Sequence, residues 1–188
     1  MNIMVIIAHP NLETSRANRA FKLEISNHAN FDVRNLYQEY PNWKIDVEKE
    51  QQLLLAYDRI VLQFPFYWYG CPPLLKKWFD DVFTYGWAYG PGGDYLKGKE
   101  FIIATTTGGT KNCYRAGGDN WFTISEFLKP IQRTITKCNG TYLPAFVTYG
   151  VSSQDNDAYI SQDNDAYISQ EAKRYVEYIQ TYSSSLIH

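Results

Sequence analysis

The sequence predicts an α/β fold in which helices cover both faces of a parallel sheet. Short, continuously apolar runs of strand length recur along the chain, as strands buried on both faces require. A helical pattern follows each run, which gives five rounds of strand and then helix. Such alternation is typical of parallel sheets, whose neighbouring strands are joined by crossover helices. No shift in composition marks a boundary, so a single domain over residues 1–188 is expected.

The expected strands and helices alternate from the first residues onward. Strands are predicted at residues 3–8, 31–36, 59–63, 101–106 and 141–148. Helices are predicted at residues 15–26, 47–56, 73–83 and 122–138, followed by a last helix that ends near Tyr182. The first helix brings Ala17, Phe21 and Ile25 to one side, as a period of 3.6 residues requires. Pro73 is tolerated in a first helical turn, whereas Pro130 is expected to disturb the helix that contains it.

The composition is that of an ordinary globular protein with an unusually high aromatic content. Hydrophobic residues make up 45% of the 188 residues and charged residues 20%, whereas aromatic residues reach 16%. The net charge of −2 gives no general attraction to nucleic acid, so no such partner is expected. Cys71, Cys113 and Cys138 are an odd number at wide spacing and match no zinc or disulfide framework. Reduced thiols and the lack of a signal-peptide pattern favour a cytoplasmic protein.

An eight-residue segment occurs twice in tandem. The letters SQDNDAYI fill residues 153–160 and again residues 161–168. Solenoid repeats need longer units and more of them, so this duplication does not indicate a repeat fold. We expect it to lengthen the loop before the last helix, because long surface insertions cost little closure entropy. An acidic lid over the binding site is the alternative interpretation.

The predicted architecture indicates where a ligand binds. In open parallel sheets ligands lie beyond the carboxyl ends of the strands, where the strand order reverses, and the loops at residues 9–18, 64–72 and 106–114 converge there. The first of these loops opens a helix, whose unpaired N–H groups and dipole suit a phosphate. Ser15 either caps this helix or binds phosphate oxygens, and Arg16 adds further donors. Neither a GxGxxG nor a Walker sequence is present, which disfavours a Rossmann or P-loop site.

The other two loops suit a flat, conjugated ring. Tyr67, Trp68 and Tyr69 precede a helix and are expected to line the site. The letters TTTGGT at residues 105–110 let backbone N–H groups approach a ligand closely, unless this segment is only a flexible turn. Tyr114 offers a phenol hydroxyl to the same edge of the ring. Because so many aromatic rings on a strand-end loop form a platform for a flat, conjugated ligand, a flavin is the obvious candidate. The chain has no metal motif and no G-x-S-x-G hydrolase elbow.

Taken together, these motifs resemble the NAD(P)H:quinone oxidoreductase family of flavodoxin-like flavoproteins. The matching segments are AHP at 8–10, SRAN at 15–18, PFYW at 65–68, PPLLK at 72–76, GWAYG at 86–90 and TTGG at 106–109. The likeness is to the short bacterial branch, which includes the ancillary oxidoreductases of glutathione-gated potassium efflux and general stress quinone reductases. The resemblance implies a flavodoxin-like three-layer sandwich with a five-stranded parallel sheet in the order 2-1-3-4-5.

The resemblance also implies the cofactor and the residues around it. A non-covalent FMN is implied, with FAD as the alternative that larger members use, and NADPH or NADH as the electron donor. The phosphate and ribityl end would be held by His9, Ser15, Arg16, Ala17 and Asn18. The ring would be held by Pro65, Phe66, Tyr67, Trp68, Thr106, Thr107, Gly108 and Gly109, with Tyr114 as the catalytic residue at its edge. Family members are homodimers with sites at the subunit interface, so the substrate pocket would be bordered by Tyr69 and by Tyr85, Trp87 and Tyr89 facing the partner's flavin.

The reaction that the resemblance implies is ping-pong, in which NAD(P)H reduces the flavin and leaves before a quinone takes two electrons. Some members carry a histidine a few residues after the tyrosine that matches Tyr114, but residues 115–119 here read RAGGD. Tyr114 alone or solvent is then expected to supply protons. One alternative is a regulatory subunit that docks on a potassium-efflux transporter at the inner face of the membrane. A flavodoxin-type electron carrier is disfavoured by the weak net charge and the GWAYG segment.

Overall fold

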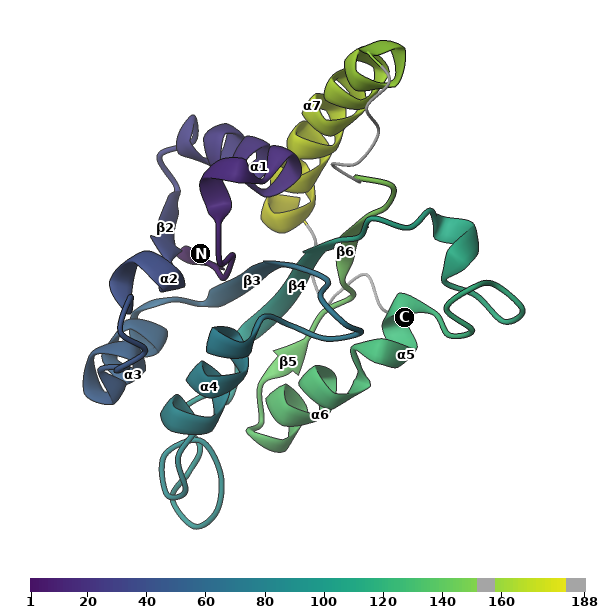
Figure 1. Ribbon diagram of the computed structural model, residues 1–188. Coiled ribbons are helices and arrows are strands. Elements are labelled where there is room, and N and C mark those ends of the chain that lie inside the picture. The colour runs from purple at the N-terminus through teal and green to yellow at the C-terminus, as the bar shows by residue number, and fades with distance from the viewer. Residues whose placement is uncertain (152–157, 182–188) are drawn as a thin grey trace.

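The computed structural model describes residues 1–151 and 158–181, and it confirms the predicted flavodoxin-like α/β fold (Figure 1). All the pairings in its sheet are parallel, and the strand order is β2-β1-β3-β4-β5, with β6 also paired to β4. The strands are β1 (Ile3–Ile7), β2 (Phe31–Asn35), β3 (Arg59–Pro65), β4 (Glu100–Thr106), β5 (Thr141–Tyr142) and β6 (Phe146–Thr148).

Helices cover both faces of the sheet and create two separate hydrophobic cores. One face carries α1 (Arg16–Ser26) and α7 (Ala158–Thr181), and the other carries α3 (Val47–Ala56), α4 (Pro73–Val82) and α6 (Lys129–Lys137) (Figure 1). Along β1, Val5 and Ile7 belong to the core under α1 and α7, whereas Met4 and Ile6 belong to the core under α3, α4 and α6. Successive strand side chains point to opposite faces, so an unbroken apolar run fills both cores. Within the described ranges, no helix is long and apolar enough to cross a membrane.

Prolines split two of the expected elements. The strand expected at residues 141–148 is divided into β5 and β6, because Pro144 has no N–H to donate to the ladder. The helix expected at residues 122–138 starts only at Ile124 and is divided into α5 (Ile124–Phe127) and α6, with Pro130 in the first turn of α6. Three single-turn elements were not expected, since one turn is too short to show a hydrophobic period: η1 (Leu12–Thr14), α2 (Leu36–Glu39) and η2 (Lys111–Cys113).

The second copy of the duplicated octapeptide is helical, so the prediction that the duplication lengthens a loop is wrong for this copy. Residues 161–168 lie within α7, while residues 153–157 of the first copy are outside the described residues. Ile168 ends the second copy and is buried. At helical spacing after it, Ala172, Tyr175, Val176 and Ile179 pack in the core against the sheet, so the copy continues into an amphipathic helix.

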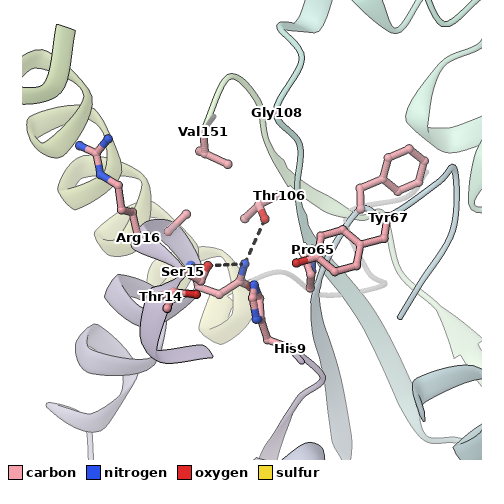
Figure 2. Close-up of a pocket in the computed structure, with 12 residues that line it drawn as sticks. His9, Thr14, Ser15, Arg16, Pro65, Tyr67, Thr106, Gly108 and Val151 are labelled. Carbon is pink, nitrogen blue, oxygen red and sulfur yellow. Dashed lines mark hydrogen bonds between the residues drawn. The ribbon is translucent and has the colours of Figure 1, made fainter. Parts of the chain in front are cut away.

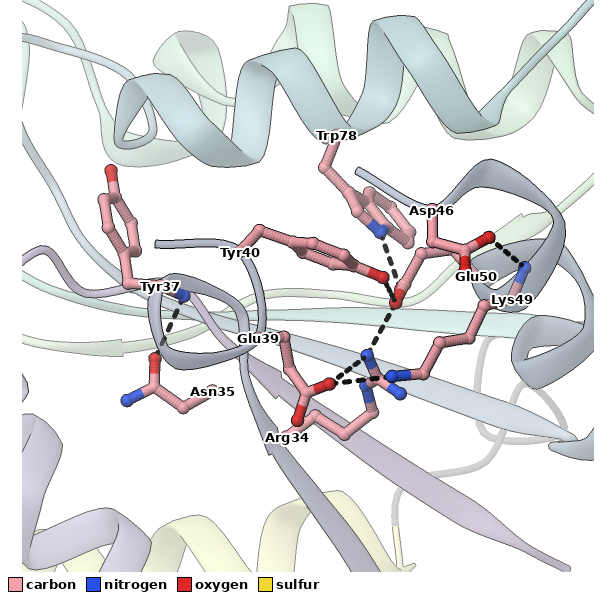
Figure 3. Close-up of polar contacts among 9 residues, drawn as sticks. All are labelled: Arg34, Asn35, Tyr37, Glu39, Tyr40, Asp46, Lys49, Glu50 and Trp78. Atoms are coloured by element: carbon pink, nitrogen blue, oxygen red, sulfur yellow. Dashed lines mark hydrogen bonds and ion pairs between the residues drawn. The ribbon is translucent and has the colours of Figure 1, made fainter. Parts of the chain in front are cut away.

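A buried carboxylate joins three elements on the α3 side of the sheet (Figure 3). Glu50 of α3 is fully buried and accepts hydrogen bonds from Arg34 of β2 at 2.6 Å and from the Tyr40 hydroxyl at 2.6 Å. The indole N–H of Trp78 in α4 donates to the other carboxylate oxygen of Glu50 at 2.9 Å. Burial, together with the neighbouring Glu50 carboxylate, raises the pKa of Tyr40, which therefore remains a donor. The cluster ties α3 and α4 to β2.

Candidate functional site

A pocket of about 310 Å³ lies beyond the carboxyl ends of β1, β3 and β4, where the sequence predicts the binding site. Figure 2 shows Thr14 and Ser15 on one side, Pro65 and Tyr67 on the other, and His9 between them. Its volume is in the range of small-molecule pockets, about 300–1,000 Å³. The lining residues are His9, Thr14, Ser15, Arg16, Ala17, Asn18, Pro65, Phe66, Tyr67, Thr106, Gly108 and Val151.

One end of the pocket is built by the N-terminus of α1. Ser15 is the N-cap of this helix, and its hydroxyl oxygen accepts a hydrogen bond from the Asn18 N–H at 3.3 Å. The first N–H groups of a helix have no carbonyl partner within it, so they are available to an anion. The Arg16 guanidinium adds positive charge at this end and forms an ion pair with Asp165 of α7 at 2.6 Å. This end of the pocket suits a phosphate.

Asn18 lies in the floor of the pocket, where its amide is held by internal hydrogen bonds. Its side-chain NH₂ donates to the hydroxyls of Thr106 at 3.1 Å and Ser15 at 3.3 Å. Gln63, the buried side chain near the end of β3, donates to the backbone and side-chain oxygens of Asn18 at 3.1 and 3.3 Å. Asn18 therefore positions Ser15 and Thr106. Gln63 is not among the predicted site residues, although a polar residue near the end of an otherwise apolar strand is a usable signal.

His9 lies at the base of the pocket as a neutral ring. Its Nδ1 atom accepts a hydrogen bond from the Asn11 N–H at 3.0 Å, and burial lowers the pKa of the imidazole. The edge of the Tyr67 ring lies close by, with ring centroids 6.1 Å apart. A neutral imidazole whose Nδ1 accepts from the backbone presents an N–H at its other ring nitrogen, so His9 is a donor next to the pocket.

The lowered pKa of His9 predicts a loss of stability in acid. As the pH falls below about 6.5, the pKa of His9 in the unfolded chain, the unfolded chain takes up a proton that the folded chain does not. Protonation therefore stabilises the unfolded state relative to the folded one. We expect the melting temperature of the flavin-free protein to fall between about pH 7 and pH 5, and to fall less in the His9→Gln variant. Thermal melts of both proteins across this range measure the difference. Equal falls would show that His9 does not contribute.

The aromatic loop turns back on itself directly after β3. Tyr67 and Gly70 exchange backbone hydrogen bonds of 3.1 and 3.0 Å, and both residues between them have positive φ, 44° at Trp68 and 63° at Tyr69. Bulky side chains rarely adopt this conformation, and such outliers often mark functional sites. The turn leaves Trp68 with 92% of its surface exposed, outside the pocket. Pro65, Phe66 and Tyr67 line the pocket, and Trp68 does not.

A smaller recess of about 180 Å³ lies on the other side of Phe66. It is lined by Phe66, Trp68, Tyr69, Tyr114 and Asn120, and the Tyr69 hydroxyl donates to the Asn120 side-chain oxygen at 3.2 Å. The Phe66 ring meets Tyr114 edge-on, with centroids 5.9 Å apart. Tyr69 and Tyr114 thus lie next to the main pocket, and the Phe66 ring separates these two tyrosines from that pocket.

The glycine-rich loop after β4 borders the pocket through its backbone. Thr106 and Gly108 line the pocket, whereas the Thr107 hydroxyl is turned to the Gly109 carbonyl, to which it donates at 2.8 Å. The Thr107 N–H donates to the Thr148 carbonyl at 2.9 Å, which anchors the loop to β6. A Cβ atom at Gly108 would meet no atom within 4 Å, so open space borders the backbone there. A ligand could therefore approach this backbone closely.

Tyr85, Trp87 and Tyr89 lie at the opposite end of the molecule from the chain's own pocket. α4 runs antiparallel to the strands, so the segment that follows it lies near their amino ends (Figure 1). Trp87 stacks on Tyr95 with centroids 5.6 Å apart, and Tyr89 lines a separate cavity of about 350 Å³ between α4 and α6. These three residues do not contribute to the pocket of their own chain.

The residues of the pocket fit FMN. N–H groups, hydroxyls and a guanidinium gather at the α1 end for the phosphate. Pro65, Phe66 and Tyr67 offer flat apolar surface for a ring, and the open space beside Gly108 admits the ring edge to the backbone. Among the described residues, no group of three His, Cys, Asp or Glu side chains is placed to hold a metal ion.

Comparison with protein families and curated proteins gives consistent matches. A model of the flavodoxin-like fold matches residues 1–170. General stress protein 14 of Bacillus subtilis is 55% identical over 152 residues, which are 81% of this chain and 87% of that protein. The uncharacterized NAD(P)H oxidoreductase YdeQ of the same organism is 52% identical over 149 residues, 79% and 76% of the two chains. The potassium-efflux ancillary protein KefF of Salmonella arizonae is 41% identical over 155 residues, 82% and 87% of the two chains.

Solved structures agree with these matches. General stress protein 14 of Treponema denticola, in complex with FMN, superposes with a TM-score of 0.87 at 36% identity, covering 96% of this chain and 98% of that one. An NADPH-quinone reductase of P. pentosaceus gives 0.75 at 36% identity, covering 92% and 98%. A chain described as a tryptophan halogenase from S. violaceusniger gives 0.86 at 44% identity, covering 96% and 99%, so the fold by itself does not fix the substrate. From the family match over most of its length and the close curated relatives, the chain belongs to the flavodoxin-like family that includes these NAD(P)H oxidoreductases.

Proposed function

We propose that this protein is an FMN-dependent NAD(P)H:quinone oxidoreductase. The observation that carries the proposal is a single pocket in which a helix N-terminus suited to a phosphate faces an aromatic and glycine-rich wall suited to a flat ring. The FMN complex of the Treponema relative supports FMN rather than FAD. The NADPH-quinone reductase of P. pentosaceus supports a quinone as the acceptor. The B. subtilis relative named as an NAD(P)H oxidoreductase supports a nicotinamide donor.

The residues of the pocket divide into three roles in this proposal. The phosphate is held by the first N–H groups of α1 together with Ser15 and Arg16, and it lies beside Ala17 and the His9 ring. Asn18 positions Ser15 and Thr106 through its side-chain hydrogen bonds. Pro65, Phe66 and Tyr67 support the ring, with Trp68 at the rim, and the backbone of residues 106–109 reaches its polar edge. When bound, FMN supplies the hydride-accepting and two-electron chemistry.

Tyr114 is the residue that we propose to move a proton. Burial raises the pKa of its phenol, so the hydroxyl is protonated at neutral pH and can donate to a charged ring edge. The Tyr114 ring meets the edge of Phe66, which lines both the pocket and the recess that holds Tyr114, so the phenol lies at the border of the pocket. Because one pocket must receive NAD(P)H and the quinone in turn, the exchange is ping-pong.

The proposed active unit is a homodimer in the cytoplasm. Tyr85, Trp87 and Tyr89 lie too far from the pocket of their own chain to contact its substrate, because α4 carries them to the other end of the strands. In a symmetric dimer the same residues can reach the pocket of the partner. Tyr69, at the recess behind Phe66, completes the substrate side within the chain.

Anaerobic spectroscopy tests the proposal. We expect purified protein to show flavin absorbance that bleaches on addition of NADPH or NADH and returns after one equivalent of a benzoquinone. Protein stripped of flavin and reloaded with FMN serves as the matched control and should behave identically. Flavin that neither nucleotide reduces would leave an electron carrier as the better assignment. Protein that cannot take up FMN at all would overturn the proposal.

A regulatory subunit of a potassium-efflux transporter is a second candidate, favoured by the 41% identity to the ancillary protein KefF. In that case the protein would bind the transporter at the inner face of the membrane and regulate it, and its reductase activity would be secondary. Co-purification with a coexpressed transporter of that class distinguishes the two functions. A stable complex supports the regulatory role, and recovery of the oxidoreductase alone with full quinone turnover supports an independent enzyme.

A further inference from the structure

We propose that Asp165 is an internal counter-ion that competes with a ligand phosphate for Arg16, so that the second copy of the duplicated octapeptide weakens phosphate binding. The inference rests on the proposed function in so far as that phosphate belongs to FMN. It goes beyond it by assigning a role to α7 and to the duplication, neither of which is otherwise part of the site.

The geometry places the carboxylate at the anion end of the pocket. Arg16 is the first residue of α1 and lines the pocket, and its guanidinium contacts the Asp165 carboxylate at 2.6 Å. In Figure 2 the Arg16 side chain extends toward α7, away from Pro65 and Tyr67 across the pocket. A carboxylate and a phosphate use the same guanidinium donors, and both are anions. Asp165 therefore occupies donors that a phosphate at the α1 N-terminus would otherwise use.

The contacts of α7 fix the second copy in this position. The Tyr167 hydroxyl donates to the Tyr149 carbonyl at 3.1 Å, and Ile168 is buried in the core. One turn further on, the Thr148 hydroxyl donates to Glu171 at 3.1 Å. These three contacts set the rotation of the helix and hold Asp165 on the side that faces α1.

The size of the effect follows from the exposure of the pair. The side chains of Arg16 and Asp165 are 30% and 70% exposed, so solvent screens their attraction. Exposed ion pairs of this kind change equilibria by about two- to fivefold. Removing the carboxylate charge should therefore tighten phosphate binding by this factor, provided that the fold is unchanged.

The test compares flavins with and without a phosphate. Flavin-free wild-type protein, Asp165→Asn and the control Glu177→Gln are titrated with FMN and with riboflavin, using the loss of flavin fluorescence on binding. Glu177 is an exposed acid on the same helix, so the control matches the change in net charge. We expect D165N to bind FMN about two- to fivefold more tightly than wild type, while riboflavin affinity and the E177Q variant remain unchanged.

The outcomes separate this inference from the proposed function. Equal or weaker FMN binding by D165N would overturn the competition and indicate that Asp165 instead orients Arg16. If wild type binds neither flavin, the proposed function fails, and inorganic phosphate decides the inference alone. A larger rise in melting temperature with phosphate in D165N than in wild type then supports the counter-ion, and an equal rise overturns it.

Discussion

Replacing Ser15 by aspartate is expected to weaken FMN binding by roughly ten- to a hundredfold while leaving the fold intact. Aspartate caps helices about as well as serine, so the hydrogen bond from the Asn18 N–H can be kept. The new carboxylate, however, lies where the phosphate is proposed to bind. Two like charges about 4 Å apart near a protein surface repel by up to about 4 kcal/mol, which solvent and the helix dipole reduce.

The Ser15→Asn variant is the matched control, because asparagine caps the helix without adding charge. Fluorescence titration with FMN should show near wild-type affinity for S15N and strong loss for S15D. Riboflavin, which has no phosphate, should bind all three proteins alike. If S15D bound FMN as tightly as S15N, the phosphate would have to lie elsewhere than at the N-terminus of α1.

Truncation of Glu50 to alanine is expected to lower the free energy of unfolding by about 3–5 kcal/mol, the typical cost of removing one partner from a buried ion pair. The carboxylate is fully buried and accepts hydrogen bonds from Arg34, Tyr40 and Trp78. Without it, three donors lose their acceptor, and among the described residues Arg34 retains only its longer 3.4 Å contact with Glu39 (Figure 3). Since small domains are stable by about 5–15 kcal/mol, this loss is a large share of the total stability.

Denaturant melts of Glu50→Ala and of the control Glu48→Ala measure this effect. Glu48 is an exposed residue in the first turn of the same helix, so its truncation should change stability by no more than about 0.5 kcal/mol. A loss below about 1 kcal/mol in E50A would mean that water reaches the cluster and replaces the carboxylate.

The sequence does not predict this cluster, whereas it does predict where the pocket lies, for a physical reason. The pocket depends on loops at the ends of strands, and those loops are recognisable because each follows an apolar run. Glu50, Arg34 and Tyr40 are ordinary polar residues in the sequence, and only the packing of α3 and α4 against the sheet buries them together. Likewise Gln63 gains its role under Asn18 only once β3 lies next to β1.

Predictions from apolar periodicity were also wrong where a single proline interrupted a longer predicted strand or helix. Pro144 and Pro130 interrupted the expected strand and helix, and the effect of the first was not anticipated. The duplicated octapeptide is predicted to lengthen a loop, but its second copy lies within α7. The helix that contains this copy is stabilised by Ala172, Tyr175, Val176 and Ile179, which the sheet covers.

By itself, the sequence determined the α/β class, the position of most strands and helices, and the three loops that meet at the pocket. These depend on apolar periodicity and on helix starts, which are properties of neighbouring residues. The tertiary structure decided which of the predicted side chains line the pocket. In the fold Trp68 is exposed, and the Asn18 amide donates to Thr106 within the protein. Tyr85, Trp87 and Tyr89 lie at the far end from the pocket, and Asp165 pairs with Arg16. Each of these depends on contacts between residues far apart in the chain, and no local pattern encodes such contacts.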